Sequence, residues 1–232
     1  MRPQSYCYFM IQEFFGLLKR KFVETNVPAG SLVDREVLTG ELEKHPGDWA
    51  AVGAGAGKSI VLKREGKSPY LAWIKADILD GYARKIEKAG GIDLQIVGVG
   101  GRGHVAFHES GIPFEGSSVM LVVLDDDTVR NSVLDGHFSS AADCPSYAIS
   151  MGAELIFRAG RVVVLADGER KVEAVTRSLL GRPTPEVPLS YGLTYAEGGG
   201  TLIYVLDRIA GRELEARREA LRERGIVFVD LT

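Results

Sequence analysis

The stretch RVVVLADGERKVEAV, residues 161–175, decides the fold class. It begins with a short β-branched run, turns at Asp167 and Gly168, and continues with apolar residues three and four positions apart. This pattern is typical of a buried strand that leads into an amphipathic helix. Strand-like runs of the same kind recur at residues 94–97, 119–124 and 202–207. The alternation predicts an α/β fold with a mainly parallel sheet whose strands are buried on both faces.

The composition limits the class of protein. The chain has 232 residues, 45% apolar and 25% charged, with a formal net charge of -3, which fits one soluble domain over residues 1–232. The two cysteines, Cys7 and Cys144, lack metal-type spacing, so we expect reduced thiols and no metal. No apolar run approaches the about 20 residues that cross a bilayer, and no signal-peptide pattern is visible. We therefore expect a cytoplasmic protein that binds neither membranes nor, given its charge balance, nucleic acid.

Residues 47–73 interrupt the alternation of strands and helices. They contain GAGAGKS (53–59) followed by strand-like residues, which predicts a Gly-rich hairpin inserted into the domain. The ending GKS suggests a phosphate-binding P-loop, but that motif requires a glycine where Val52 stands and a helix after the lysine. We therefore interpret the glycines as a flexible turn and not as a nucleotide site.

A second glycine motif follows the expected strand at 94–97. Gly98, Gly100 and Gly103 satisfy the dinucleotide spacing, but residues 104–116 do not form an amphipathic helix pattern. The same loop carries His104 and Glu109 at the carboxyl end of a strand, where α/β sheets bind their ligands. A histidine there can act as general acid or base, oriented by the carboxylate. A structural role is the alternative, and His108 fits that alternative better.

Residues 97–111, VGVGGRGHVAFHESG, resemble the signature loop of the glucosamine-6-phosphate deaminases. The resemblance continues in order along the chain and covers most of it. The further matching segments are residues 2–15, 127–133, 145–152, 162–175, 187–193 and 203–214. This ordered series is more specific than any single motif.

The resemblance implies a modified Rossmann-like, three-layer α/β sandwich, shared with the 6-phosphogluconolactonases. It implies an enzyme that converts glucosamine 6-phosphate to fructose 6-phosphate and ammonia without a cofactor, and that has a small-molecule sugar phosphate as its partner. His104 then matches the ring-opening histidine and Glu109 its partner carboxylate. The neighbouring loop residues are expected to bind substrate: Gly100, Gly101, Arg102 and Gly103. The resemblance leaves a homo-oligomer open.

The chain also departs from the family pattern. Arg102 stands where the family has an acidic residue, Val133 stands where it has a phosphate-binding arginine, and a C-terminal phosphate lysine has no counterpart. The family's N-terminal phosphate loop and proton-moving aspartate have no match, so the fold is expected to be incomplete at the N-terminus. A truncated product, a diverged relative and replacement by residues 198–230 remain open explanations.

These departures leave three possible functions. We expect activity toward glucosamine 6-phosphate to be weak or altered. A 6-phosphogluconolactonase-type hydrolase is an alternative that the segment AFHE (106–109) disfavours. The other alternative is a non-catalytic sugar-phosphate-binding or interaction subunit. The loss of the family's charged site residues favours it. Arg102 is expected to bind an anionic ligand group or, alternatively, to turn to solvent or pair with a nearby acid such as Glu109.

Overall fold

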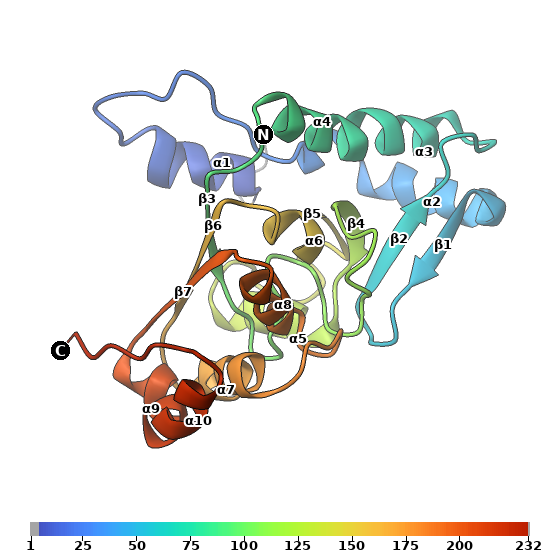
Figure 1. Ribbon diagram of the computed structural model, residues 1–232. Coiled ribbons are helices and arrows are strands. Elements are labelled where there is room, and N and C mark those ends of the chain that lie inside the picture. The colour runs from blue at the N-terminus through green and yellow to red at the C-terminus, as the bar shows by residue number, and fades with distance from the viewer. Residues whose placement is uncertain (1–4, 232) are drawn as a thin grey trace.

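The chain folds as a mixed α/β protein in which the strands form two sheets (Figure 1). The structure is a computed structural model that describes residues 5–231. The first sheet is antiparallel, in the order β1-β2-β4-β5, with strands β1 (Trp49–Val52), β2 (Lys58–Leu62), β4 (Val119–Val123) and β5 (Tyr147–Met151). The second sheet is parallel, in the order β3-β6-β7, with strands β3 (Leu94–Gly98), β6 (Arg161–Ala166) and β7 (Thr201–Leu206). The α/β class expected from the sequence is confirmed.

The expected parallel arrangement holds for the second sheet and not for the first. The apolar run at 119–124 forms β4, which pairs antiparallel with β2 on one side and with β5 on the other. The four residues Val119 to Val122 are buried, as expected. A continuous apolar run indicates that a strand is buried on both faces but carries no information on strand direction. For this reason the expected parallel pairing of β4 was wrong.

Helices α2, α3 and α4 pack against the antiparallel sheet. Helix α2 (Arg35–Lys44) begins at Asp34, whose side chain accepts hydrogen bonds from the backbone N–H groups of Glu36 and Val37. Ser68 caps the next helix, which runs without a break through α3 (Pro69–Trp73), a π-helical turn (Ile74–Leu79) and α4 (Asp80–Lys88). The apolar faces of these helices and of the sheet form one core, which includes Leu38, Leu71, Ile74, Ile60 and Leu121.

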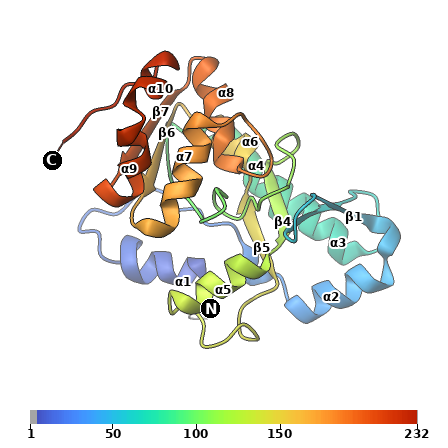
Figure 2. The ribbon, with the colours of Figure 1, turned by 90° about the horizontal axis from the view of Figure 1, so that it is seen from below.

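Helices α7 to α10 cover one face of the parallel sheet. They are α7 (Val172–Leu180), α8 (Tyr191–Glu197), α9 (Arg208–Ala216) and α10 (Arg218–Glu223), and Figure 2 shows them grouped beside β6 and β7. The remaining helical elements are α1 (Tyr6–Met10), α5 (Asp126–Leu134) and α6 (Ala153–Ile156), a π-helical turn at Ile11–Phe15, and single turns at Gly30–Leu32, Pro46–Asp48, Glu169–Lys171 and Pro188–Ser190. Val162 and Val164 of β6 are fully buried in the core under these helices.

The opposite face of the parallel sheet is open to solvent. Its apolar side chains are 44–56% exposed: Leu94, Ile96, Leu165, Ile203 and Val205. The strand register places Ile96, Val163 and Ile203 in one row across the three strands. Burial on both faces of these strands was expected, but within residues 5–231 this face of the sheet stays about half exposed. The name open face is used below for the five residues Leu94, Ile96, Leu165, Ile203 and Val205.

Two further expectations fail near the C-terminus. Residues 198–201 lead directly into β7 and do not connect a strand to a helix, as a phosphate loop would. Residues 226–230, which look like a strand in the sequence, pair with no sheet in the described part of the chain. Within residues 5–231, no helix has the length and apolar character that crossing a bilayer requires.

Candidate functional site

The loop that carries the motif residues leaves the carboxyl end of β3 and folds back on itself. The backbone N–H of Gly100 donates to the carbonyl of His104 at 3.0 Å, and that of Gly103 donates to the carbonyl of Gly100 at 2.8 Å. Gly103 has a φ of +83°, a conformation that favours glycine. No helix begins after this glycine motif, so the loop lacks the helix N-terminus that a dinucleotide site uses.

Gly100 makes room for the imidazole ring of His104. A Cβ atom at position 100 would lie 2.1 Å from Nε2 of His104 and 2.2 Å from its Cε1. Contacts of that length do not occur between real atoms, so a side chain at position 100 would displace the ring. Gly100, which the sequence suggested for substrate binding, therefore has the more direct effect of leaving space for the ring of His104.

His104 and Glu109 face each other, as the sequence predicted for a catalytic pair. Nδ1 of His104 lies 3.3 Å from Oε2 of Glu109, with the histidine side chain 18% exposed and the glutamate fully buried. Oε1 of Glu109 accepts a hydrogen bond from the backbone N–H of Asp125 at 3.4 Å. Oε2 has no hydrogen-bond partner among the described residues. A buried carboxylate oxygen without a partner is costly, so this arrangement favours the tautomer with a proton on Nδ1.

Arg102 is held by two aspartates and does not contact Glu109 in any ion pair of the described chain. Its guanidinium pairs with Asp127 and lies 3.5 Å from Oδ2 of Asp125, while its side chain is 53% exposed. Asp125 also caps α5, because its Oδ1 accepts the backbone N–H of Thr128 at 2.7 Å. Of the two expectations for this residue, the structure shows the pairing with a nearby acid, with different acids from the one named.

His108 has a structural role, as the sequence suggested. Its Nε2 lies 2.9 Å from the carbonyl of Ile112, and its Nδ1 accepts the backbone N–H of Ala153 at 3.0 Å. These two partners fix a neutral imidazole with the proton on Nε2. Burial lowers the pKa of His108 from its ordinary value, against smaller opposing effects of Ile112 and Glu109.

The turn of the β1–β2 hairpin belongs to the site, which sequence reasoning missed. Ala54 donates its backbone N–H to the carbonyl of Gly111 at 2.8 Å, and Gly57 is buried against the side chain of Glu109. The signal was present in GAGAG (53–57), because glycine and alanine at every position permit close approach of another backbone. These residues do not indicate which segment approaches.

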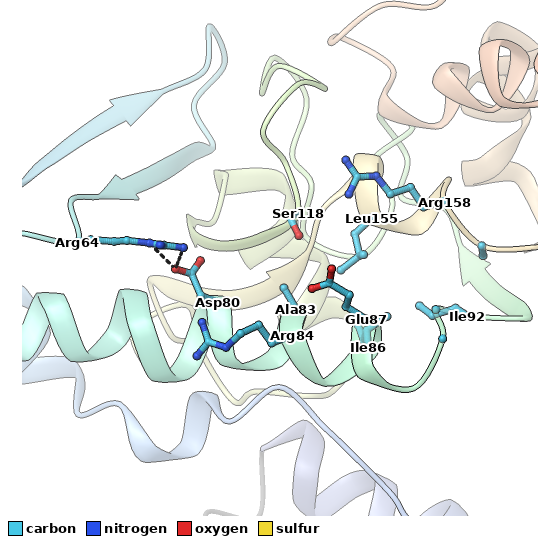
Figure 3. Close-up of a pocket in the computed structure, with 13 residues that line it drawn as sticks. Arg64, Asp80, Ala83, Arg84, Ile86, Glu87, Ile92, Ser118, Leu155 and Arg158 are labelled. Carbon is cyan, nitrogen blue, oxygen red and sulfur yellow. Dashed lines mark hydrogen bonds and ion pairs between the residues drawn. The ribbon is translucent and has the colours of Figure 1, made fainter.

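A hollow lies elsewhere on the molecule, away from His104 and Glu109 (Figure 3). It has a volume of about 630 Å³ and is lined by residues of α4 and by residues that precede β3, β4 and β6. Two of its arginines are held in ion pairs: Arg64 pairs with Asp80 at 2.8 Å, and Arg158 pairs with Glu154, which lies outside the lining. Figure 3 shows the Arg64–Asp80 pair at its wall. Among the described residues, no group of histidine, cysteine and acidic side chains is close enough to hold a metal ion.

Comparisons with known proteins agree on one family. The glucosamine-6-phosphate deaminase of Clostridium botulinum strain Langeland is 37% identical over 93% of this chain and 69% of its own length, and that of strain Kyoto is 30% identical over the same shares. No protein-family model matches the chain. The solved structure of a monomeric glucosamine-6-phosphate deaminase superposes with a TM-score of 0.65, at 23% identity, over 91% of this chain and 68% of that one.

Proposed function

Since the chain belongs to the glucosamine-6-phosphate deaminase family, we propose that it acts on glucosamine 6-phosphate and forms fructose 6-phosphate and ammonia. The observation that carries the proposal is the contact between His104 and the buried Glu109 at the carboxyl end of β3. The imidazole is partly exposed while its partner is not, so one ring nitrogen faces protein and the other remains available to a ligand.

The geometry suits the opening of a sugar ring. With Glu109 holding the proton on Nδ1, the free Nε2 accepts the proton of the C1 hydroxyl. The bond between C1 and the ring oxygen then breaks, and Nε2 returns the proton to that oxygen. The carboxylate of Glu109 stabilises the imidazolium that forms between the two transfers. Acid–base catalysis of this kind contributes roughly 10²–10⁴-fold in rate.

The remaining loop residues are proposed to contact the substrate. Gly100 leaves the space beside Nε2 of His104 free of a side chain, and Gly101 and Gly103 add no side chain to the loop, so a sugar can approach the backbone closely. Arg102 is half exposed and presents guanidinium N–H groups beside the site while Asp125 and Asp127 hold it. Arginine suits phosphate and carboxylate groups because its donors form a planar fork. We propose no cofactor for the reaction.

We also keep as proposals a cytoplasmic location, a single domain over residues 1–232 with residues 47–73 inserted, and no binding to nucleic acid. The balance of 28 basic and 31 acidic residues supports the last of these. A homo-oligomer is likewise kept as a proposal from the resemblance.

A non-catalytic sugar-phosphate binder is the second candidate function. It is favoured by two residues, Arg102 where the family has an acid and Val133 where the family has a phosphate-binding arginine. Loss of a charge-assisted contact costs about 1.5–3 kcal/mol, so substrate affinity and turnover are expected to be lower than in a typical relative.

One experiment separates the two functions. Ammonia release and calorimetric binding are measured with saturating glucosamine 6-phosphate for the wild type, for His104→Gln and for His137→Gln, which changes an exposed histidine. If the protein is a deaminase, the wild type releases ammonia, His104→Gln loses most of this activity and His137→Gln keeps it. Binding without ammonia release in the wild type supports the binder. If the wild type neither binds the substrate nor releases ammonia, both proposed functions are refuted.

A further inference from the structure

We infer that the glycine turn of the β1–β2 hairpin, residues 53–57, positions the carboxylate of Glu109 against His104. The inference rests on the proposed function, in which Glu109 is the partner of the ring-opening histidine. It gives a role in the reaction to a segment that looks like a surface insertion in the sequence.

The first support is the contact between Gly57 and Glu109. Gly57 is buried, and a Cβ atom built on it would lie 2.5 Å from Cβ of Glu109 and 2.6 Å from its Cγ. Both neighbouring atoms belong to the inner part of the glutamate side chain, which cannot move without moving the carboxylate. Only glycine at position 57 therefore allows Glu109 its present conformation.

The second support is the close approach of the two backbones around this contact. A Cβ atom on Gly55 would lie 2.3 Å from the carbonyl oxygen of Ser110, and one on Gly111 would lie 2.5 Å from the backbone nitrogen of Gly55. Gly111 has a φ of +88°, and its carbonyl accepts the N–H of Ala54 at 2.8 Å. The turn is thus fitted to residues 109–111 along its length and not at one point.

The third support is how the turn is anchored. Nζ of Lys58 donates to the carbonyl of Gly53 at 2.6 Å and closes the turn from within. Strand β2, which follows, pairs with β4 so that Lys58 stands opposite Val123. Strand β4 in turn leads to Asp125, the backbone donor to Oε1 of Glu109. The hairpin and the end of β4 therefore enclose the same carboxylate from two sides.

This enclosure explains why Glu109 is fully buried while His104 remains partly exposed. An electrostatic contact is stronger where water is excluded, and a fixed carboxylate needs no reorganisation when the imidazole takes up a proton. The hairpin turn supplies both conditions without contacting the sugar. We class Gly57 as a positioning residue, acting through Glu109.

The test compares Gly57→Ala with Gly47→Ala. Gly47 is exposed, precedes the same hairpin, and has open space where a Cβ would be placed. The readouts are the imidazole nitrogen chemical shifts of His104 by NMR, kcat and KM for glucosamine 6-phosphate, and the unfolding transition. We expect Gly57→Ala to change the His104 shifts and to lower kcat roughly 100-fold, the cost typical of a misplacement of about 1 Å, with KM little changed. Gly47→Ala should match the wild type in every readout.

A second variant covers the case in which Gly57→Ala fails to fold. Lys58→Met removes the ammonium group that closes the turn and leaves the glycines in place. It should change the His104 shifts and kcat in the same direction by a smaller factor. Wild-type His104 shifts in a folded Gly57→Ala, or in Lys58→Met, would overturn the inference. If the wild type releases no ammonia but its His104 shifts respond to Gly57→Ala, the positioning stands and the proposed reaction fails.

Discussion

Replacing Glu109 with glutamine separates the proposed catalytic role of this residue from its role in stability. The variant has nearly the same shape, and its amide oxygen can still accept the backbone N–H of Asp125 that Oε1 accepts now at 3.4 Å. The amide nitrogen then lies where Oε2 lies, 3.3 Å from Nδ1 of His104. Because an amide nitrogen donates, Nδ1 must become the acceptor and the proton must move to Nε2.

The magnitude follows from this change of tautomer. With its proton on Nε2, His104 cannot accept the proton of the C1 hydroxyl, so the acid–base contribution of about 10²–10⁴-fold is lost, equivalent to roughly 3–5 kcal/mol of activation free energy. Stability should change in the opposite direction or not at all. Glu109 is fully buried with one long hydrogen bond, and a buried charge costs several kcal/mol that its partners repay only in part. We expect the free energy of unfolding of Glu109→Gln to equal or exceed that of the wild type.

The assay pairs steady-state ammonia release with urea unfolding, and Glu115→Gln, an exposed site, is the control. The expected result is a large loss of kcat in a protein that is at least as stable as the wild type. Retained activity would show that the carboxylate does not set the tautomer. A loss of more than about 2 kcal/mol in unfolding free energy would show that Glu109 is mainly structural, and either result refutes the reasoning.

Three further changes have defined outcomes. Gly100→Ala places a Cβ atom 2.1 Å from the ring of His104, so kcat should fall by roughly 100-fold while the protein stays folded by circular dichroism. Arg102→Ala removes a half-exposed guanidinium from its contacts with Asp127 and, at 3.5 Å, with the buried Asp125. Because the guanidinium is screened by water, stability should change by less than about 1 kcal/mol in thermal unfolding. If Arg102 binds the substrate, affinity for glucosamine 6-phosphate in calorimetry should drop by about tenfold or more. The pKa of His108 is lower in the folded state because of burial, so the unfolded state takes up a proton first as pH falls below about 6.5. Urea unfolding should therefore show stability that is constant above that pH and declines below it, with a weaker decline in His108→Gln.

The sequence predicted the elements and the contact between His104 and Glu109 because both depend on local pattern. The β-branched runs at β3, β6 and β7 identify strands by composition, and the spacing between His104 and Glu109 lies within one loop. Such features depend only on residues that are close together in the sequence, so they can be predicted without knowing distant contacts.

The remaining features depend on contacts between distant segments. A hydrophobic run does not state whether β4 pairs parallel or antiparallel, and an apolar residue such as Ile203 does not reveal from the sequence that it is 44% exposed. The partners of Arg102 come from α5, and the glycine turn meets residues 109–111 more than 50 positions away in the chain. Glycines indicate close approach without naming the other surface.

The open face of the parallel sheet governs how the protein behaves as a solute. Its five aliphatic side chains form a partly exposed patch across three strands, of a kind that adheres to other apolar surfaces and to dyes such as ANS. A net charge of only -3 supplies weak repulsion between molecules. We expect this face to promote association between molecules, and exchanging Ile203 or Val205 for threonine should raise the solubility of the protein without altering the contact between His104 and Glu109.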